Sequence, residues 1–92
     1  MGERNILNHR RSDIDIVHDI LTLTQDGVRK TKILYQVNLS YTQLKNYLLF
    51  LVSNNFIEEV VKDDNHGPHM TYQATEKGLC FMEDINKVMS HL

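Results

Sequence analysis

Four cations stand without carboxylates in the middle of the chain. Residues 27–57 contain no Asp or Glu, and their only charged side chains are Arg29, Lys30, Lys32 and Lys45. A surface that approaches a polyanion must keep carboxylates away from it, because like charges repel at short range. The stretch therefore favours contact with a polyanion, and the simpler alternative is an ordinary solvated basic surface.

The same stretch offers side chains that hydrogen-bond to nucleic-acid bases. On a helix over 41–54, Thr42, Asn46 and Leu49 share the side opposite the apolar residues, with Lys45 beside them. Asn pairs with adenine, Lys reaches guanine or phosphate, and an apolar group meets the thymine methyl. An apolar Leu49 within a polar face indicates a partner, which is either DNA or another protein.

Backbone amides at two expected helix starts suit phosphate oxygens, and basic or hydroxyl side chains lie beside them. The candidate DNA-binding residues are Arg29, Lys30, Lys32, Ser40, Tyr41, Thr42, Gln43, Lys45, Asn46 and Leu49. The N-terminal arm over 1–11 carries Arg4, Arg10 and Arg11. These arginines either reach a neighbouring groove of the DNA or only contribute solubility.

Other reactive residue types form weaker patterns. His66 and His69 flank Gly67-Pro68, but zinc needs three or four ligands, so we expect no metal site. Cys80 lies in an apolar helical pattern without a basic neighbour, and we expect a buried structural thiol. The sequence has no nucleophile elbow, no Gly-rich phosphate loop and no HExxH motif. We therefore expect no enzymatic activity, no cofactor and no small-molecule substrate.

Two helices precede the segment that carries the base-reading side chains. Ser12 is a good N-cap for a helix over 13–25, whose apolar residues recur at helical spacing and which ends at Gly27. A short second helix over 30–37 ends at Asn38, a residue type that tolerates the left-handed conformation.

The third helix is the most strongly patterned. Ser40 and Gln43 form the S-x-x-Q pattern of a capping box at its start. Its apolar side is made by Leu44, Tyr47, Leu48, Leu51 and Val52. Two helices joined by a turn of about three or four residues, the second of them capped, predict a helix-turn-helix.

A hairpin and a last helix follow. Residues 56–61 and 70–74 are rich in β-branched and aromatic types and indicate strands, with the polar segment 62–69 as their loop. Thr75 caps a helix over 76–91. A stripe at spacings of 3, 4 and 3 predicts a coiled-coil seam between two copies, formed by Met82, Ile85, Met89 and Leu92.

The order α-α-α-β-β-α predicts a mainly α protein with a small β-hairpin, a winged helix-turn-helix with a C-terminal dimerisation helix. The helix over 41–54 is the expected recognition helix, and the loop over 62–69 is the expected wing. The expected organisation is a basic arm over 1–11, a winged domain over 12–75 and the dimerisation helix over 76–92.

Composition favours one globular domain in a reducing compartment. Of 92 residues, 41% are hydrophobic and 24% charged, which excludes disordered and fibrous classes. The longest apolar run, residues 48–52, is far shorter than the ~18–20 residues that cross a bilayer, and no secretory signal is visible. The single cysteine forms no internal disulfide. We therefore expect a cytoplasmic, nucleoid-associated protein without membrane contact.

Two segments resemble a known family. Residues 30–48, KTKILYQVNLSYTQLKNYL, resemble the KT-I-Y-ANLSY-QL-KYL stretch of small archaeal winged-helix proteins. Residues 72–78, YQATEKG, resemble their Y-x-L-T-x-K-G entry into the last helix. The resemblance covers about residues 12–90 and implies a DNA-binding transcription regulator or chromatin-associated protein that dimerises through its last helix. Asp63 and Asp64 depart from the family, whose wing often carries bases.

Two functions are therefore open. The first is double-stranded DNA binding by a homodimer, with the helix over 41–54 in the major groove. The second is a winged-helix protein–protein interaction module in a transcription-related complex, because one fold serves both purposes. The net charge of −2, the single lysine on the recognition helix and the acidic loop favour the second.

Overall fold

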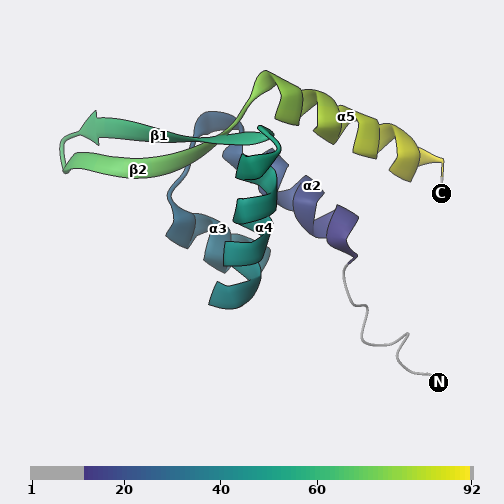
Figure 1. Cartoon of the computed structure of the whole chain (residues 1–92), viewed down its shortest axis with the longest axis horizontal. Helices are drawn as coiled ribbons and strands as arrows, with labels where there is room; N and C mark the ends of the chain where they lie inside the picture. The colour runs from purple at the N-terminus through teal and green to yellow at the C-terminus, as the bar shows by residue number, and fades with distance from the viewer. Residues whose placement is uncertain (1–11, 92) are drawn as a thin grey trace.

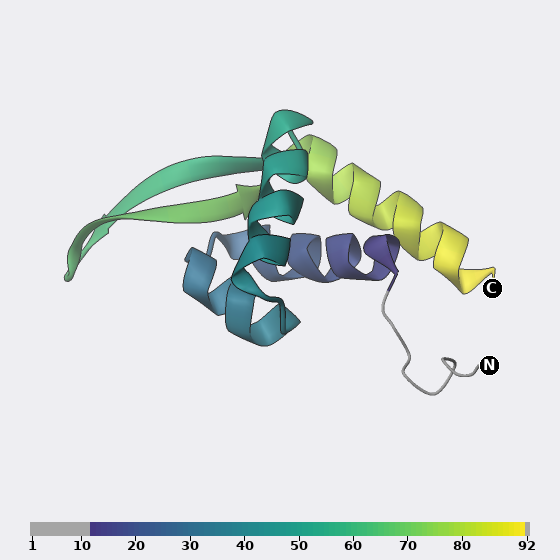
Figure 2. The ribbon, with the colours of Figure 1, turned by 60° about the horizontal axis from the view of Figure 1, so that its bottom comes forward.

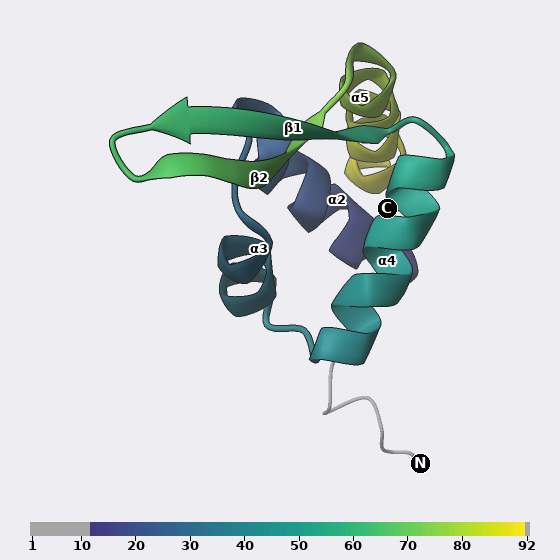
Figure 3. The ribbon, with the colours of Figure 1, turned by 60° about the vertical axis from the view of Figure 1, so that its left-hand side comes forward.

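Four α-helices, a short 3-10 turn and a two-stranded antiparallel hairpin make up residues 12–91, the part of the chain that the computed structural model describes (Figure 1). In chain order the elements are α2 (Asp13–Leu23), η1 (Thr24–Asp26), α3 (Lys30–Val37), α4 (Tyr41–Ser53), β1 (Ile57–Asp64), β2 (Gly67–Ala74) and α5 (Glu76–Ser90). The predicted element order and the mainly helical winged class are confirmed. The hairpin projects from a body made by the helices (Figures 1 and 3).

Local sequence signals begin and end the first helices. The Ser12 hydroxyl accepts a hydrogen bond from the Asp15 amide at 3.2 Å, and the Asp15 carboxylate accepts from the Ser12 amide at 3.2 Å. This reciprocal capping box fixes the start of α2. α2 ends at Leu23, two residues before its predicted end, where the chain tightens into η1. Asn38 ends α3 in the left-handed conformation, with φ 59° and ψ 57°.

The hairpin is longer and its loop tighter than predicted. β1 and β2 pair as far as Asp64 and Gly67, so that only Asn65 and His66 form the turn. The prediction of a loop over 62–69 is therefore wrong. The Asp64 carboxylate accepts a hydrogen bond from the His66 amide at 2.8 Å, and Gly67 adopts φ 86°, so these residues close a tight turn.

The outer strand of the hairpin is β1, because β2 is paired on both sides. Val28 donates its N–H to the Tyr72 carbonyl at 3.0 Å and accepts from the Tyr72 N–H at 2.8 Å. β2 thus lies between β1 and the segment that joins η1 to α3. This bridge fixes the root of the hairpin beside the start of α3.

α5 runs back alongside α2 and extends beyond its first turn (Figures 1 and 2). Gly78 and Ile85 are buried on the side of α5 that faces the body. A Cβ atom placed on Gly78 would lie 2.0 Å from the carbonyl oxygen of Phe56 and 3.2 Å from Leu21 Cδ2. Only glycine permits this close approach of α5 to the start of β1.

One core connects the helices with the hairpin root. Its fully buried aliphatic side chains are Ile20, Leu21, Ile33, Leu44, Leu51 and Ile57. Cys80 is exposed, so the prediction of a buried thiol is wrong. It lies on the side of α5 opposite Gly78 and Ile85, which no element within residues 12–91 covers. Among the described helices, none has the length and apolar character that a bilayer span requires.

Candidate nucleic-acid interface

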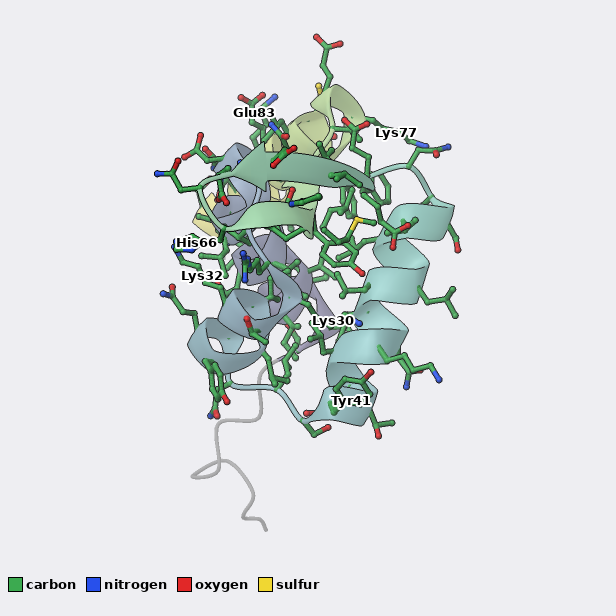
Figure 4. The ribbon with its side chains drawn as sticks, turned by 90° about the vertical axis from the view of Figure 1, so that its left-hand side faces the viewer. Lys30, Lys32, Tyr41, His66, Lys77 and Glu83 are labelled. Atoms are coloured by element: carbon green, nitrogen blue, oxygen red, sulfur yellow. The ribbon has the colours of Figure 1, made fainter. Side chains whose placement is uncertain are left out.

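The ten predicted DNA-binding residues are all exposed, and all lie on α3, α4 or their N-caps. Figure 4 shows Lys30 and Lys32 on α3 and Tyr41 at the start of α4, on the face seen from the end of the hairpin. The fold therefore brings the residues of the acid-free stretch onto neighbouring helices.

A capping box shapes the start of α4. The Ser40 hydroxyl accepts from the Gln43 amide at 3.1 Å, and Gln43 Oε1 accepts from the Ser40 amide at 2.9 Å. Two of the predicted residues thus hold the helix start in place. The amides of Tyr41 and Thr42 have no acceptor within the helix, because the first turn of any helix lacks preceding carbonyls. They are available to an anion at this end of α4.

A cation–aromatic contact joins α3 to α4. Lys30 Nζ lies 5.7 Å from the centroid of the Tyr41 ring, a ring that is 64% exposed. At this distance the ring face attracts the ammonium group. The contact places one positive charge directly beside the first turn of α4.

Tyr72 of β2 lies near the same helix start. Burial raises the pKa of its hydroxyl above the ordinary value of 10.0, and the Glu59 carboxylate, which accepts its proton at 3.3 Å, raises it further. Tyr41 contributes a smaller effect in the same direction. Tyr72 therefore remains a neutral hydrogen-bond donor that holds Glu59 against the hairpin.

The outer side of α4 carries the predicted base-reading residues. Thr42, Lys45 and Asn46 are exposed, and Leu49 is 65% exposed. The opposite side is buried as predicted, with Leu44 and Leu51 fully inaccessible. This exposed row has the residue types that contact base edges in the major groove.

The wing, which is the hairpin β1–β2, contributes carboxylates. The side chain of Lys62 points away from the tip and toward the helical body, where its Nζ donates a hydrogen bond to the Asp26 carbonyl at 3.0 Å. Asp63 and Asp64 are exposed near the tip, and Asp64 lies 3.7 Å from the ring of His69. The wing tip is therefore poorly suited to phosphate when its histidines are neutral.

The molecule separates its charges. α3 and α4 contain no carboxylate, whereas β1 and α5 hold the seven acids Glu58, Glu59, Asp63, Asp64, Glu76, Glu83 and Asp84. In Figure 4, Glu83 lies beyond the hairpin from Lys30 and Lys32. α3, α4 and their N-caps therefore carry four positive charges although the chain as a whole carries a net charge of −2, while Asp13 of α2 borders α4 at Tyr47.

The predicted dimerisation stripe is partly used within the chain. Ile85 is 5% exposed and belongs to the core, and the Met82 sulfur accepts a hydrogen bond from the Thr22 hydroxyl at 3.4 Å. Met89 is 38% exposed, and its neighbour Val88 is 57% exposed. Leu92 and the basic arm over 1–11 lie outside the described residues.

Two candidate residues were missed by the sequence analysis. Tyr35 is 79% exposed on α3, and it could have been found because Ile33, Leu34 and Val37 account for the inward side of that helix. Val88 was left out of the predicted seam, but it is more exposed than the seam residues that the structure describes. Within residues 12–91, no group of three or more His, Cys, Asp or Glu side chains could hold a metal ion.

Two archaeal relatives share sequence with the chain. One uncharacterized protein of Methanocaldococcus jannaschii is 35% identical over 52 residues, which cover 55% of this chain and 54% of the relative. A second uncharacterized protein of that organism is 34% identical over 80 residues, covering 86% of this chain and 34% of the relative. The chain thus spans about half the length of the first relative and about a third of the second.

Two solved structures are similar over most of the chain. A PadR-like transcriptional regulator from Bacillus cereus has a TM-score of 0.75 at 20% identity and covers 83% of this chain and 82% of its own. Sso10a-2, a DNA-binding protein from Sulfolobus solfataricus, has a TM-score of 0.71 at 25% identity, with 87% and 80% covered. The model of the family described as winged helix-turn-helix matches residues 10–92, and the chain belongs to that family.

Proposed function

We propose that the protein is a DNA-binding transcriptional regulator or chromatin-associated protein that inserts α4 into the major groove of duplex DNA. The observation that carries the proposal is the exposed α3–α4 surface, which has four cations and no carboxylate. A polyanion is the partner that such a surface attracts most strongly.

The contacts divide into two kinds. Arg29, Lys30 and Lys32, with the free amides at the start of α4, suit phosphate oxygens and would fix the position of the protein on the duplex. Further along α4, Asn46 and Lys45 suit base edges, and Leu49 suits a thymine methyl group. Tyr35 extends the phosphate-binding row along α3.

The wing does not take part as a phosphate clamp in this proposal. Asp63 and Asp64 would repel the DNA backbone, and Lys62 is held at the hairpin root by the Asp26 carbonyl. Recognition therefore depends on the helices. The proposal agrees with the relatives of this fold, since one similar structure is described as a transcriptional regulator and another as a DNA-binding protein.

We also propose that two copies pair through the end of α5. Val88 and Met89 are exposed on the last turn of α5, and Ile14, which is 51% exposed, lies on the first turn of α2. Burial of these apolar side chains would stabilise a dimer. In a two-fold dimer the recognition helices contact half-sites about one helical turn apart, or a multiple of it.

A fluorescence anisotropy titration with labelled duplex DNA tests DNA binding. We expect the wild type to bind with an affinity that falls steeply between about 50 and 200 mM salt, because cations are released from the duplex. Lys45→Glu should abolish binding. The matched control is Lys77→Glu, which reverses a charge near the far end of α4, where Lys77 Nζ donates to the Asn54 carbonyl at 3.0 Å.

Absent or salt-independent binding of the wild type would refute the proposal, as would equal losses in the two variants. The acidic wing favours a second function, a protein–protein interaction module in a transcription-related complex. In that case Lys45→Glu leaves binding to the protein partner intact.

Light scattering tests the dimer. The double variant Val88→Glu, Met89→Glu should be monomeric at concentrations where the wild type is a dimer, because it places charges in the apolar contact. Glu83→Gln, on the exposed side of the same helix, should keep the mass of the wild type. A wild type that is monomeric throughout the concentration range would disprove the pairing.

A further inference from the structure

A cavity of about 510 Å³ opens where α2, α4 and α5 meet. Its walls are mainly apolar and come from all three helices: Ile14, Val17, Tyr47, Phe50, Phe81 and Ile85. We call it the three-helix pocket. Its volume lies within the range of about 300–1,000 Å³ that is typical of sites for small molecules.

The aromatic walls are held in place before any ligand arrives. Phe81 stacks on Phe56 with ring centroids 4.4 Å apart and an interplanar angle of 12°. Phe50 also packs against Phe56, with 6.2 Å between the two ring centroids. Tyr47 donates its hydroxyl proton to Asp13 Oδ1 at 2.5 Å. A ligand therefore meets a formed site, which lowers the entropic cost of binding.

The polar residues that line the pocket include one carboxylate and no cation among the described residues. Among the residues that the structure describes, Asp13 is the pocket's only ionisable acid or base apart from the Tyr47 hydroxyl, and the amides of Gln43 and Asn46 complete the polar rim. A carboxylate beside aromatic rings suits a ligand with a flat apolar body and a positive end, because it attracts the charge while the rings stack on the body.

We infer that the three-helix pocket binds a small planar aromatic compound that carries an amine. The flat body lies between Phe50, Phe81 and Tyr47, and the ammonium group contacts the carboxylate of Asp13. Phe50 is 46% exposed, and no element within residues 12–91 covers this apolar area at the mouth of the pocket.

The position of the pocket gives the ligand an influence on α4. Asn46 belongs both to the pocket rim and to the outer row of α4. An amide that contacts a ligand is less available to a base, so an occupied pocket should weaken DNA binding. This consequence rests on the proposed function, whereas ligand binding itself does not.

Three probes of one shape test the pocket: 2-naphthylmethylamine, 2-naphthylmethanol and 2-naphthylacetate. Calorimetric titration of the full chain without DNA should give the tightest binding for the amine, about five-fold tighter than the alcohol, the effect of one exposed ion pair. The carboxylate should bind most weakly. Asp13→Asn keeps an acceptor for Tyr47 and should remove the preference of the amine over the alcohol.

Variants of the walls separate the pocket from other apolar surface. Phe50→Ala should weaken all the probes that bind by about five-fold or more, because one aromatic wall is lost. Phe50→Leu provides a second wall variant if Phe50→Ala does not fold, because it removes the ring and keeps an apolar side chain. Val61→Ala is the matched control, since it removes an exposed apolar side chain from the wing, where Val61 is 64% exposed, and it should leave probe binding unchanged.

Three results would overturn the inference. The first is that the amine shows no saturable binding, and the second is that the amine and the carboxylate bind with equal affinity. The third is that the affinity for the amine falls as protein concentration rises, which would show that a second copy of the chain occupies the pocket. Loss of DNA affinity with the amine bound, measured by anisotropy, supports the link to α4. If the wild type binds no DNA, the calorimetric result alone decides whether the pocket is a ligand site.

Discussion

Gly78→Ala should destabilise the protein although it replaces glycine inside a helix. In an exposed helix this change stabilises by about 1 kcal/mol, because alanine has the higher helix propensity. Here the added methyl group would lie 2.0 Å from the Phe56 carbonyl oxygen and 2.9 Å from its carbon. Both obstacles are backbone atoms, so no side-chain rotation relieves the clash, and α5 must move away from the start of β1.

The magnitude follows from three contributions. Overpacking of a well-packed site costs about 3 kcal/mol at the upper end of its usual range. The Thr75 amide donates to the same Phe56 carbonyl at 3.0 Å, and loss of this bond costs about 1 kcal/mol. Subtracting the propensity gain of about 1 kcal/mol leaves a net loss of about 3 kcal/mol. For a domain of this size the melting temperature should fall by about 12–24 °C.

Thermal unfolding followed by circular dichroism checks this value. The matched control is Cys80→Ala, which introduces the same residue two positions further along α5 at an exposed site, and it should shift the midpoint by no more than about 4 °C. If Gly78→Ala melts within a few degrees of the wild type, the packing of α5 against Phe56 is not as described.

Three further measurements address the interface and the titrating groups. With three cations placed on phosphates, Arg29, Lys30 and Lys32, log affinity for DNA should fall with log salt at a slope of about −2.7 per protomer, and Lys32→Gln should reduce its magnitude by about 0.9, unlike Lys77→Gln. Because folding raises the pKa of Tyr72, the unfolded chain loses this proton at a lower pH than the folded protein. The free energy of unfolding should therefore fall as pH rises above about 10. The Tyr72→Phe variant should show a weaker decline, and equal declines in the variant and the wild type would contradict the assignment. Cys80 should react with a maleimide in the native protein nearly as fast as in the unfolded chain, as mass spectrometry would record, whereas protection would contradict its exposure.

The helical part of the fold could be predicted because its signals are local. Ser40 and Gln43 lie within one turn, and their capping box forms with the predicted partners. Asn38 adopts the left-handed conformation expected from its residue type. The side of α4 that carries Leu44 and Leu51 was recognised because helical spacing alone determines which residues share a face.

Features that depend on distant contacts were not accessible in the same way. The apolar stripe of α5 did not reveal that α2 covers Ile85 while Val88 stays exposed, because spacing does not identify the partner of a face. Cys80 was assigned to the core for the same reason. The polar residues after Val61 suggested a loop, yet pairing across the hairpin continues to Asp64. The three-helix pocket combines residues from segments far apart in the sequence, and no local pattern marks it.

Val28 bridges β2 at Tyr72, whereas the structure describes no pairing partner on the outer side of β1. An open strand of this kind invites a second chain to add to the ladder. The strand carries the acids Glu58, Glu59, Asp63 and Asp64 along its length, and two such strands placed side by side would bring these acids together. Aggregation through the sheet margin is thereby disfavoured.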